Sequence, residues 1–199
     1  MKILLATTNK AKIQQYRHFL IDQGHQIVSL HDLGFDKTEV NEDGNSPLEN
    51  ALIKARVFNK LGGLPTFASD EGLYFDDLPE EIQPRVHVRR VNGKRLNDQE
   101  MIEDYTTLVT KYGKEGFLNG YFLKAIALII EDKEYTLEFK IKRELTNKVS
   151  QKIQEGYPLA SIQYFEKYQK FKSELTDKEE YDIMKEEYKI ISNFLLEII

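Results

Sequence analysis

Residues 3–30 contain two short apolar runs separated by a polar turn and an amphipathic segment, and this order restricts the possible folds more than any other feature. Ile3 to Ala6 is short, continuous and apolar, as buried strands are. After the turn, apolar residues recur at helical spacing from about Lys12 and stop at Gly24. Gln26 to Leu30 is a second strand candidate. The chain therefore begins strand–turn–helix–strand, which predicts an α/β fold with a parallel pair of strands.

The next predicted helix has clear boundaries. Ser46 is a natural N-cap, Pro47 suits the first helical position, and Glu49 is placed to complete a capping box. Gly62-Gly63 provides the stop. Further along, the pattern predicts a short strand at 66–69, a sharp turn at 70–72, a helix at 98–112, antiparallel strands at 121–130 and 135–141, and a long final helix at 176–199.

The composition excludes several classes of protein. The chain has 199 residues, enough for one large domain or for two lobes that share a cleft, and no cysteine, which rules out disulfides and thiolate chemistry. A net charge of −5 argues against a protein that binds nucleic acid along a basic stripe. No apolar run approaches the roughly 20 residues of a membrane helix, so we expect a cytoplasmic protein without a membrane partner.

The segment Thr7-Thr8-Asn9-Lys10-Ala11-Lys12 is a candidate site for an anion. The first amides of a helix have no partner within the helix, and the helix dipole favours negative charge at that end. Thr7, Thr8 and Asn9 add side-chain donors, and Lys12 adds a full positive charge. The alternative is that Thr8 or Asn9 only caps the helix while the lysines are solvated.

Carboxylates from two loops and one lysine form a second candidate site. Glu42 precedes the capped helix, and Asp70 and Glu71 follow a predicted strand, where α/β folds place ligands. Magnesium takes one or two carboxylates together with substrate phosphates, and one carboxylate can accept a proton from an attacking water. Lys54 flanks the buried stripe of its helix, from which it can neutralise phosphate charge. The plainer alternatives are loop solvation for Glu42 and a helix-edge side chain for Lys54.

Together, these segments resemble the inosine triphosphate pyrophosphatase family, enzymes that remove aberrant purine nucleotides. The first segment is similar to the family's T-x-N-x-x-K turn. Glu42-Asp43-Gly44, Glu49-Asn50-Ala51 and Lys54-Ala55 are similar to its E-x-G…E-N-A-x-x-K-A stretch. Ala68-Ser69-Asp70-Glu71-Gly72-Leu73 stands where the family has A-D-D-S-G-L.

The resemblance implies an elongated, two-lobed α/β fold, with a mixed sheet, flanking helices and a central cleft. It also implies that residues 1–199 are a single domain, commonly assembled as a homodimer. The implied reaction is attack of water on a nucleoside triphosphate, which releases pyrophosphate and a monophosphate with Mg²⁺ as cofactor. The expected catalytic residues are Asp70, as general base, and Lys54. The expected metal ligands are Glu42 and Asp70, and the expected substrate contacts are Thr7, Thr8, Asn9, Lys12, Lys54, Glu71 and Tyr157.

The sequence departs from the family where the base would be recognised. Gln154-Glu155-Gly156-Tyr157-Pro158-Leu159 keeps only Gly-Tyr of G-F-G-Y-D-P, and Met184-Lys185-Glu186 replaces a late S-H-R. In Pro84-Arg85-Val86-His87-Val88-Arg89-Arg90, only the proline and Arg90 match P-G-x-Y-S-A-R-Y. Matched donors and acceptors give much of base discrimination, so we expect an altered base preference.

Two departures leave alternatives open. Ser69 replaces the first aspartate of the family's pair, and Glu71, in place of serine, either joins the metal site or repels the triphosphate. The chain is therefore an active pyrophosphohydrolase, a nucleotide-binding paralogue that acts through a protein partner, or an unrelated α/β binding domain. Residues 167–199 form either a partner helix or a helix packed on its own lobe. The aromatic residues that either stack on a base or belong to the core are Tyr157, Tyr164, Phe165 and Tyr168.

Overall fold

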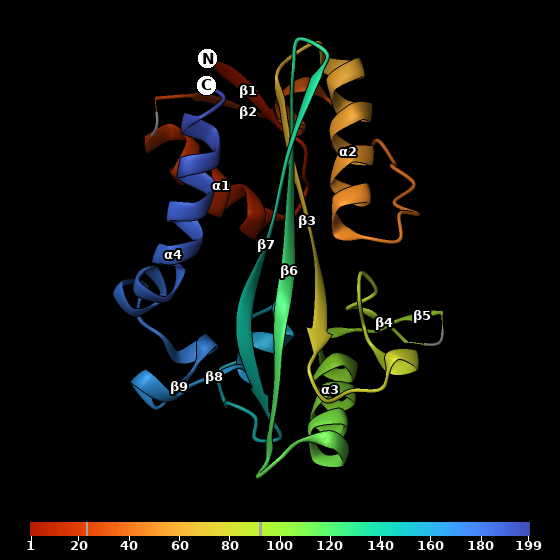
Figure 1. Cartoon of the computed structure of the whole chain (residues 1–199), viewed down its shortest axis with the longest axis vertical. Coiled ribbons are helices and arrows are strands. Elements are labelled where there is room, and N and C mark those ends of the chain that lie inside the picture. Colours follow the sequence, from red (N-terminus) through yellow and green to blue (C-terminus); the bar gives the residue numbers. More distant parts are fainter. Residues whose placement is uncertain (23, 92) are drawn as a thin grey trace. The chain divides into compact units, whose positions relative to one another are not determined.

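The computed structural model describes residues 1–22, 24–91 and 93–199 (Figure 1). Its helices are α1 (Lys10–Asp22), α2 (Pro47–Gly62), α3 (Asp98–Tyr112) and α4 (Asp177–Leu196). Its longer strands are β1 (Lys2–Leu5), β2 (Gln26–Ser29), β3 (Thr66–Phe75), β6 (Phe117–Ile130) and β7 (Lys133–Thr146). Four two-residue strands are β4 (Arg90–Val91), β5 (Lys94–Arg95), β8 (Tyr164–Phe165) and β9 (Lys170–Phe171). No helix among the described residues is long and apolar enough to cross a bilayer.

The chain folds into two compact units. Unit 1 contains Met1–Glu71, Lys124–Phe139 and Phe194–Ile199, and unit 2 contains Gly72–Leu123 and Lys140–Asn193. The long strands β3, β6 and β7 contribute residues to both units. Each unit has its own cluster of buried apolar residues.

The five-stranded sheet has the order β2-β1-β3-β6-β7. β1 pairs in parallel with both β2 and β3, which confirms the parallel pair predicted from the first thirty residues. β6 and β7 are neighbours joined by a two-residue turn, in which Glu131 and Asp132 both have positive φ angles. Such a short connection makes this pair antiparallel, so the sheet is mixed.

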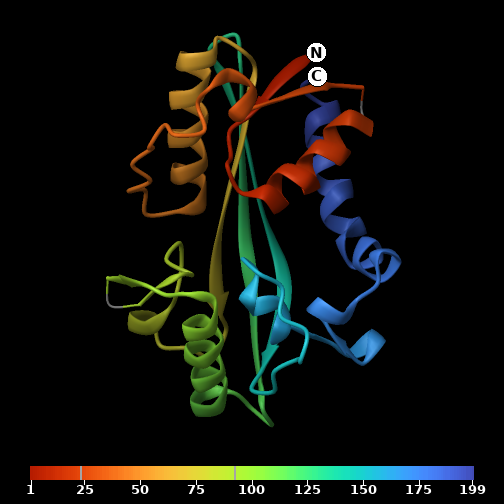
Figure 2. The same cartoon turned by 180° about the vertical axis from the view of Figure 1, so that it is seen from behind.

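In unit 1, helices α1 and α2 lie on opposite faces of the sheet (Figures 1 and 2). On one face, the rings of Tyr16 in α1 and Phe67 in β3 lie 5.0 Å apart between centroids. On the other face, Ala51, Ala55 and Phe58 of α2 pack in one buried cluster with Ala68 of β3. The sheet therefore carries a helix on each side, as an α/β fold requires.

Helix α2 begins where the sequence predicts, but its capping box does not form. The Ser46 side chain accepts a hydrogen bond from the Glu49 amide, as an N-cap does. The Glu49 carboxylate, however, accepts from the amide of Asn45, at 2.6 Å, and not from that of Ser46. Gly63 ends the helix with φ +61°, which confirms the predicted glycine stop.

The predicted turn at Asp70-Glu71-Gly72 is wrong, because β3 runs unbroken from Thr66 to Phe75. The acidic pair and the glycine suggest a turn locally, and the pairing with β1 has already ended at Phe67, but the other neighbour of β3, the long strand β6, continues beside it. As a consequence, Asp70 and Glu71 are held on a rigid strand, on which successive side chains point to opposite faces.

In unit 2, helix α3 has the reciprocal capping box that α2 lacks, formed by Asn97 and Glu100. Its apolar stripe packs on β3 and β6 in a cluster that includes Phe75, Tyr105 and Leu118. Helix α4 buries Glu187, Ile191 and Leu195, which recur every four residues and so lie on one face. Most of this helix belongs to unit 2 and its end to unit 1, and its buried face favours the packing interpretation over an unpacked partner helix.

Candidate active site

The predicted carboxylates and lysine meet around one ammonium group in unit 1. Lys54 Nζ donates to Glu42 Oε2 at 2.7 Å and to Asp70 Oδ1 at 3.0 Å. The Lys54 and Asp70 side chains are 12% and 17% exposed, whereas that of Glu42 is 40% exposed. Because both carboxylate oxygens contact the same nitrogen, two negative charges converge on one point that solvent still reaches.

Asn50 is part of this cluster, although the sequence interpretation did not assign it a role. Its Nδ2 donates to Asp70 Oδ2 at 3.2 Å, and its Oδ1 accepts from the Gly44 amide at 2.9 Å. A side chain on Gly44 would bring a Cβ within 2.7 Å of that same Oδ1, so the glycine permits the close approach. Asn50 thus fixes both the Asp70 carboxylate and the loop that carries Glu42. Its position four residues before Lys54, on the same helix face, was the available signal.

The Thr7–Lys12 turn lies at the same edge of the sheet. The register pairs Leu5 of β1 with Phe67 of β3, the Ala6 amide still donates to the Phe67 carbonyl at 2.8 Å, and the turn begins at Thr7, whose amide donates back to the Leu5 carbonyl at 2.9 Å. Asn9 caps α1, because its Oδ1 accepts from the Lys12 amide at 3.4 Å and its carbonyl from the Ile13 amide at 2.9 Å. The capping interpretation is therefore correct for Asn9. It does not conflict with anion binding, since Thr8, Asn9 and Lys10 are exposed at the helix end.

Glu71 does not contact the Lys54 cluster, which we define as Glu42, Asn50, Lys54 and Asp70. Its Oε2 lies 3.9 Å from Lys124 Nζ, and Lys124 belongs to the neighbouring strand β6 and has a side chain only 13% exposed. Adjacent residues on a strand point to opposite faces, so Asp70 is directed at α2 and Glu71 away from it. Sequence reasoning missed Lys124, because a lysine inside an apolar strand carries no motif.

In unit 2, the aromatic candidates are engaged in their own surroundings. The Tyr164 ring lies 6.0 Å from that of Phe117 and 5.6 Å from that of Phe171. Phe165 lies under the Arg143 guanidinium, and the Tyr168 hydroxyl donates to Asp182. These contacts favour the packing interpretation for the three residues. Tyr157 is half-buried and lies in a turn, in which its own amide donates to the Gln154 carbonyl.

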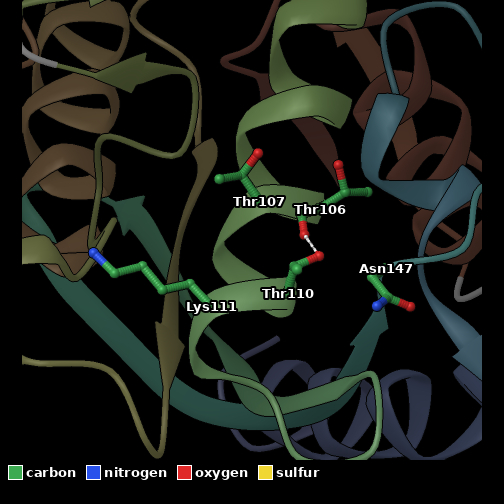
Figure 3. A pocket seen from close by; sticks show the side chains of 5 residues that line it. All are labelled: Thr106, Thr107, Thr110, Lys111 and Asn147. Atoms are coloured by element: carbon green, nitrogen blue, oxygen red, sulfur yellow. Dashed lines mark hydrogen bonds between the residues drawn. The ribbon is translucent and has the colours of Figure 1, made fainter.

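A shallow pocket of about 300 Å³ lies on helix α3 of unit 2 (Figure 3). It is lined by three threonines with Lys111 and Asn147. Each threonine hydroxyl donates to a carbonyl of its own helix, for example Thr110 to Thr106 at 2.8 Å. The lining has no carboxylate and no metal-ligating histidine, so it lacks the groups that the predicted chemistry needs.

The donor set of the Lys54 cluster fits a magnesium ion that shares its coordination with a substrate. The described residues contain no group of three or more His, Cys, Asp or Glu side chains that would hold a metal by themselves. Glu42 and Asp70 offer two converging carboxylates, and Mg²⁺ commonly takes one or two, with phosphates and waters completing its shell. The residues present therefore suit this ion when a phosphorylated ligand is bound.

A helix-flanked mixed sheet with a lysine, two carboxylates and a helix N-terminus at one edge defines an α/β protein equipped for phosphate chemistry. The sequence profile of the Ham1 family matches residues 3–186. The chain belongs to the Ham1 family, and the resemblance inferred from its three motifs is thereby confirmed. At the level of the family, the predicted enzyme class, a pyrophosphatase, is also confirmed.

Individual relatives agree with this assignment. The chain is 32% identical to a dITP/XTP pyrophosphatase of Thermoanaerobacter pseudethanolicus, over 90% of this chain and 87% of that protein. It is 37% identical to a dITP/XTP pyrophosphatase of Salmonella typhimurium over about half of each chain, with 51% and 50% covered.

Solved structures confirm the mixed α/β fold. The Ham1 protein of Staphylococcus aureus superposes with a TM-score of 0.75 at 21% identity, covering 98% of this chain and 97% of that one. A nucleoside-triphosphatase/dITP/XTP pyrophosphatase of Mycobacterium abscessus gives a TM-score of 0.72 at 28% identity, covering 98% and 99%.

Proposed function

We propose that this protein is a magnesium-dependent nucleoside triphosphate pyrophosphohydrolase, which releases pyrophosphate and a nucleoside monophosphate. The observation that carries the proposal is the Lys54 ammonium held between Glu42 and Asp70 at 2.7 and 3.0 Å, with Asn50 fixing the second Asp70 oxygen. A protein that only binds nucleotides has little need for a fixed carboxylate beside a cation.

In unit 1, the phosphates are bound by the N-terminal end of α1 and by two lysine side chains. The exposed N-terminus of α1 offers amides and a favourable dipole, with Thr7, Thr8 and Asn9 as side-chain donors. Lys12 and Lys54 add positive charge that balances the triphosphate. Glu42 and Asp70 would hold Mg²⁺, which when bound supplies further neutralisation of phosphate charge.

Asp70 is the proposed general base. A water attacks the α-phosphorus, its proton passes to an Asp70 carboxylate oxygen, and the bond between the α-phosphorus and the bridging oxygen breaks. Pyrophosphate leaves with that oxygen, and the monophosphate keeps the oxygen of the water. Asn50 directs the carboxylate by hydrogen bonding to Oδ2 at 3.2 Å. Proton transfer to a positioned base contributes about 10²–10⁴-fold to the rate.

The substrate class we propose is a nucleoside triphosphate, with a base specificity altered from that of the purine-selective family that the sequence resembles. The altered choice is supported by the replaced residues at 154–159 and 184–186, where the family's motifs are lost. Tyr157 is the proposed contact to the base. We also propose that residues 1–199 form a single domain and that the protein is a homodimer. Light scattering on the purified protein tests the homodimer.

One alternative function is favoured by a specific observation, the changed acidic pair Ser69 and Glu71. A nucleotide-binding paralogue with little turnover would tolerate that change and act through a protein partner. The deciding experiment measures pyrophosphate release from a panel of ribo- and deoxynucleoside triphosphates with Mg²⁺, alongside binding of the same nucleotides. Release from at least one nucleotide is expected. Binding of several nucleotides without release would overturn the enzymatic proposal in favour of the paralogue.

Lys124 is expected to prevent Glu71 from repelling the substrate. Lys124→Met leaves the Glu71 carboxylate, on the opposite face of β3 from Asp70, without its nearby cation, so long-range repulsion should raise KM for the triphosphate by about tenfold. Adding Glu71→Gln removes the repelling charge and should restore KM. Steady-state kinetics of the two single variants and the double variant measure this. A double variant that is no better than Lys124→Met would show that Lys124 acts by itself.

A further inference from the structure

The turn that precedes Tyr157 is held by two charged side chains that no motif identifies. In unit 2, Arg89 Nη1 donates to Asp98 Oδ1 at 2.6 Å, and Arg89 Nη2 donates to the Gly156 carbonyl at 3.2 Å. The Gly156 amide in turn donates to Asp98 Oδ2 at 2.7 Å. The two side chains thereby bind each other and both backbone polar groups of one residue. We call these three residues the Gly156 clamp.

The clamp acts on a solvent-exposed segment that leads into the buried turn Pro158–Ser161. Residues 151–156 are all exposed, and Gly156 has φ +79°, a conformation that other residues rarely adopt. The Tyr157 amide donates to the Gln154 carbonyl at 2.9 Å, and the Tyr157 carbonyl accepts from Ala160 at 3.0 Å. The backbone of Tyr157 is therefore held from two sides, by the Gly156 clamp before it and by the buried turn after it.

The side of the clamp on α3 is rigid and remains charged. Asp98 is the first residue of α3, directly after the N-cap Asn97, and a carboxylate is favoured at that end of a helix. The Arg89 guanidinium, and secondly the Gly156 amide, lower the pKa of Asp98, so the carboxylate stays ionised at neutral pH. Charge-assisted hydrogen bonds of this kind are about twice as strong as neutral ones.

A nearby ion pair shows what an ordinary surface contact looks like. Lys94 Nζ donates to Glu100 Oε1 at 2.6 Å, in the same turn of α3, but this pair has no bond to residues 154–157 among the hydrogen bonds of the described chain. Exposed pairs of this type contribute little to stability. The Gly156 clamp differs because Arg89 donates to the Gly156 carbonyl and Asp98 accepts from the Gly156 amide. Both side chains therefore hold the backbone of a turn.

We propose that Arg89 and Asp98 are positioning residues that orient the Gln154–Tyr157 turn and thereby set the enzyme's preference among nucleobases. This inference rests on the proposed function, because it assigns Tyr157 to the base. Neither side chain needs to touch the substrate: the clamp fixes the backbone that presents Tyr157. A displacement of a substrate-positioning group by about 1 Å can cost as much as 10²-fold in rate.

The test compares Arg89→Ala, Arg89→Lys and the matched control Lys94→Ala in the full chain. Hydrogen–deuterium exchange of the peptide that contains Gly156 and Tyr157 should become about tenfold faster in Arg89→Ala and stay unchanged in the control. The ratio of kcat/KM between the best and the second-best nucleoside triphosphate should change by about tenfold in Arg89→Ala. Arg89→Lys, which keeps the charge but lacks the fork, should fall between the two.

The outcomes separate this inference from the proposed function. If the wild type hydrolyses no nucleotide, the proposed function fails, and ratios of dissociation constants for the same nucleotides replace kcat/KM. Unchanged exchange in Arg89→Ala would show that the clamp does not hold the turn. Faster exchange with unchanged nucleotide ratios would show that the turn does not read the base. Either result overturns the proposal, and a uniform loss of activity on all nucleotides does so as well.

Discussion

Asp70→Asn is expected to lower kcat by about 10³-fold, because the amide cannot take a proton from water at neutral pH and no longer offers a charged oxygen to a divalent ion. The substitution preserves the size of the side chain. Its amide still reaches Asn50, and Lys54 keeps its 2.7 Å contact with Glu42. The fold around β3 should therefore persist while the chemistry is lost.

Pyrophosphate release at saturating nucleotide and Mg²⁺ measures this loss, and Asp43→Asn is the matched control. Asp43 lies in the same acidic loop as Glu42, and its replacement by asparagine removes the same unit of charge. Its carboxylate, however, accepts a hydrogen bond from Asn41 and not from Lys54. The control should retain turnover close to that of the wild type. If Asp70→Asn retains more than about a tenth of wild-type kcat, well above what loss of a general base allows, then Asp70 is not the base.

The part of the site that lies in sequence-local motifs was predictable. The start of α2 at Ser46 and a cap at Asn9 follow from short-range spacing, and the motifs singled out Glu42, Lys54 and Asp70, although not their direct contacts. The parallel pairing of β1 with β2 also follows from the strand–helix–strand order of the first thirty residues.

The contacts that depend on strand pairing were not predictable in the same way. The sequence around Asp70 suggests a turn, yet β3 continues through it because its neighbour β6 supplies a pairing partner that a local pattern does not contain. For the same reason, local sequence patterns did not reveal Lys124, which lies near Glu71 only because β6 pairs with β3. It also concealed the contact between Arg89 and Gly156, which are 67 residues apart in the chain.

Lys54→Met should separate two roles that the structure gives to one ammonium group. The apolar part of the lysine stem is kept, so packing on α2 changes little. Without the cation, the triphosphate loses one neutralising partner, and kcat/KM should fall by about 10²–10³-fold, as when one preorganised donor is removed. At the same time, Glu42 and Asp70 lose the ammonium that now contacts both of them.

That second change predicts an opposite effect on the metal. In the free protein, Mg²⁺ must compete with the Lys54 ammonium for the same two carboxylates. Removal of that ammonium should therefore tighten Mg²⁺ binding by about tenfold, as expected for one nearby like charge. Titration calorimetry of Mg²⁺ into nucleotide-free protein measures this, with Lys60→Met, an exposed lysine on the same helix, as the control. Tighter metal binding with slower turnover is the pattern that assigns Lys54 to the phosphates. Weaker metal binding would instead mean that Lys54 organises the two carboxylates for the ion, and a variant with unchanged turnover would remove it from the catalytic residues.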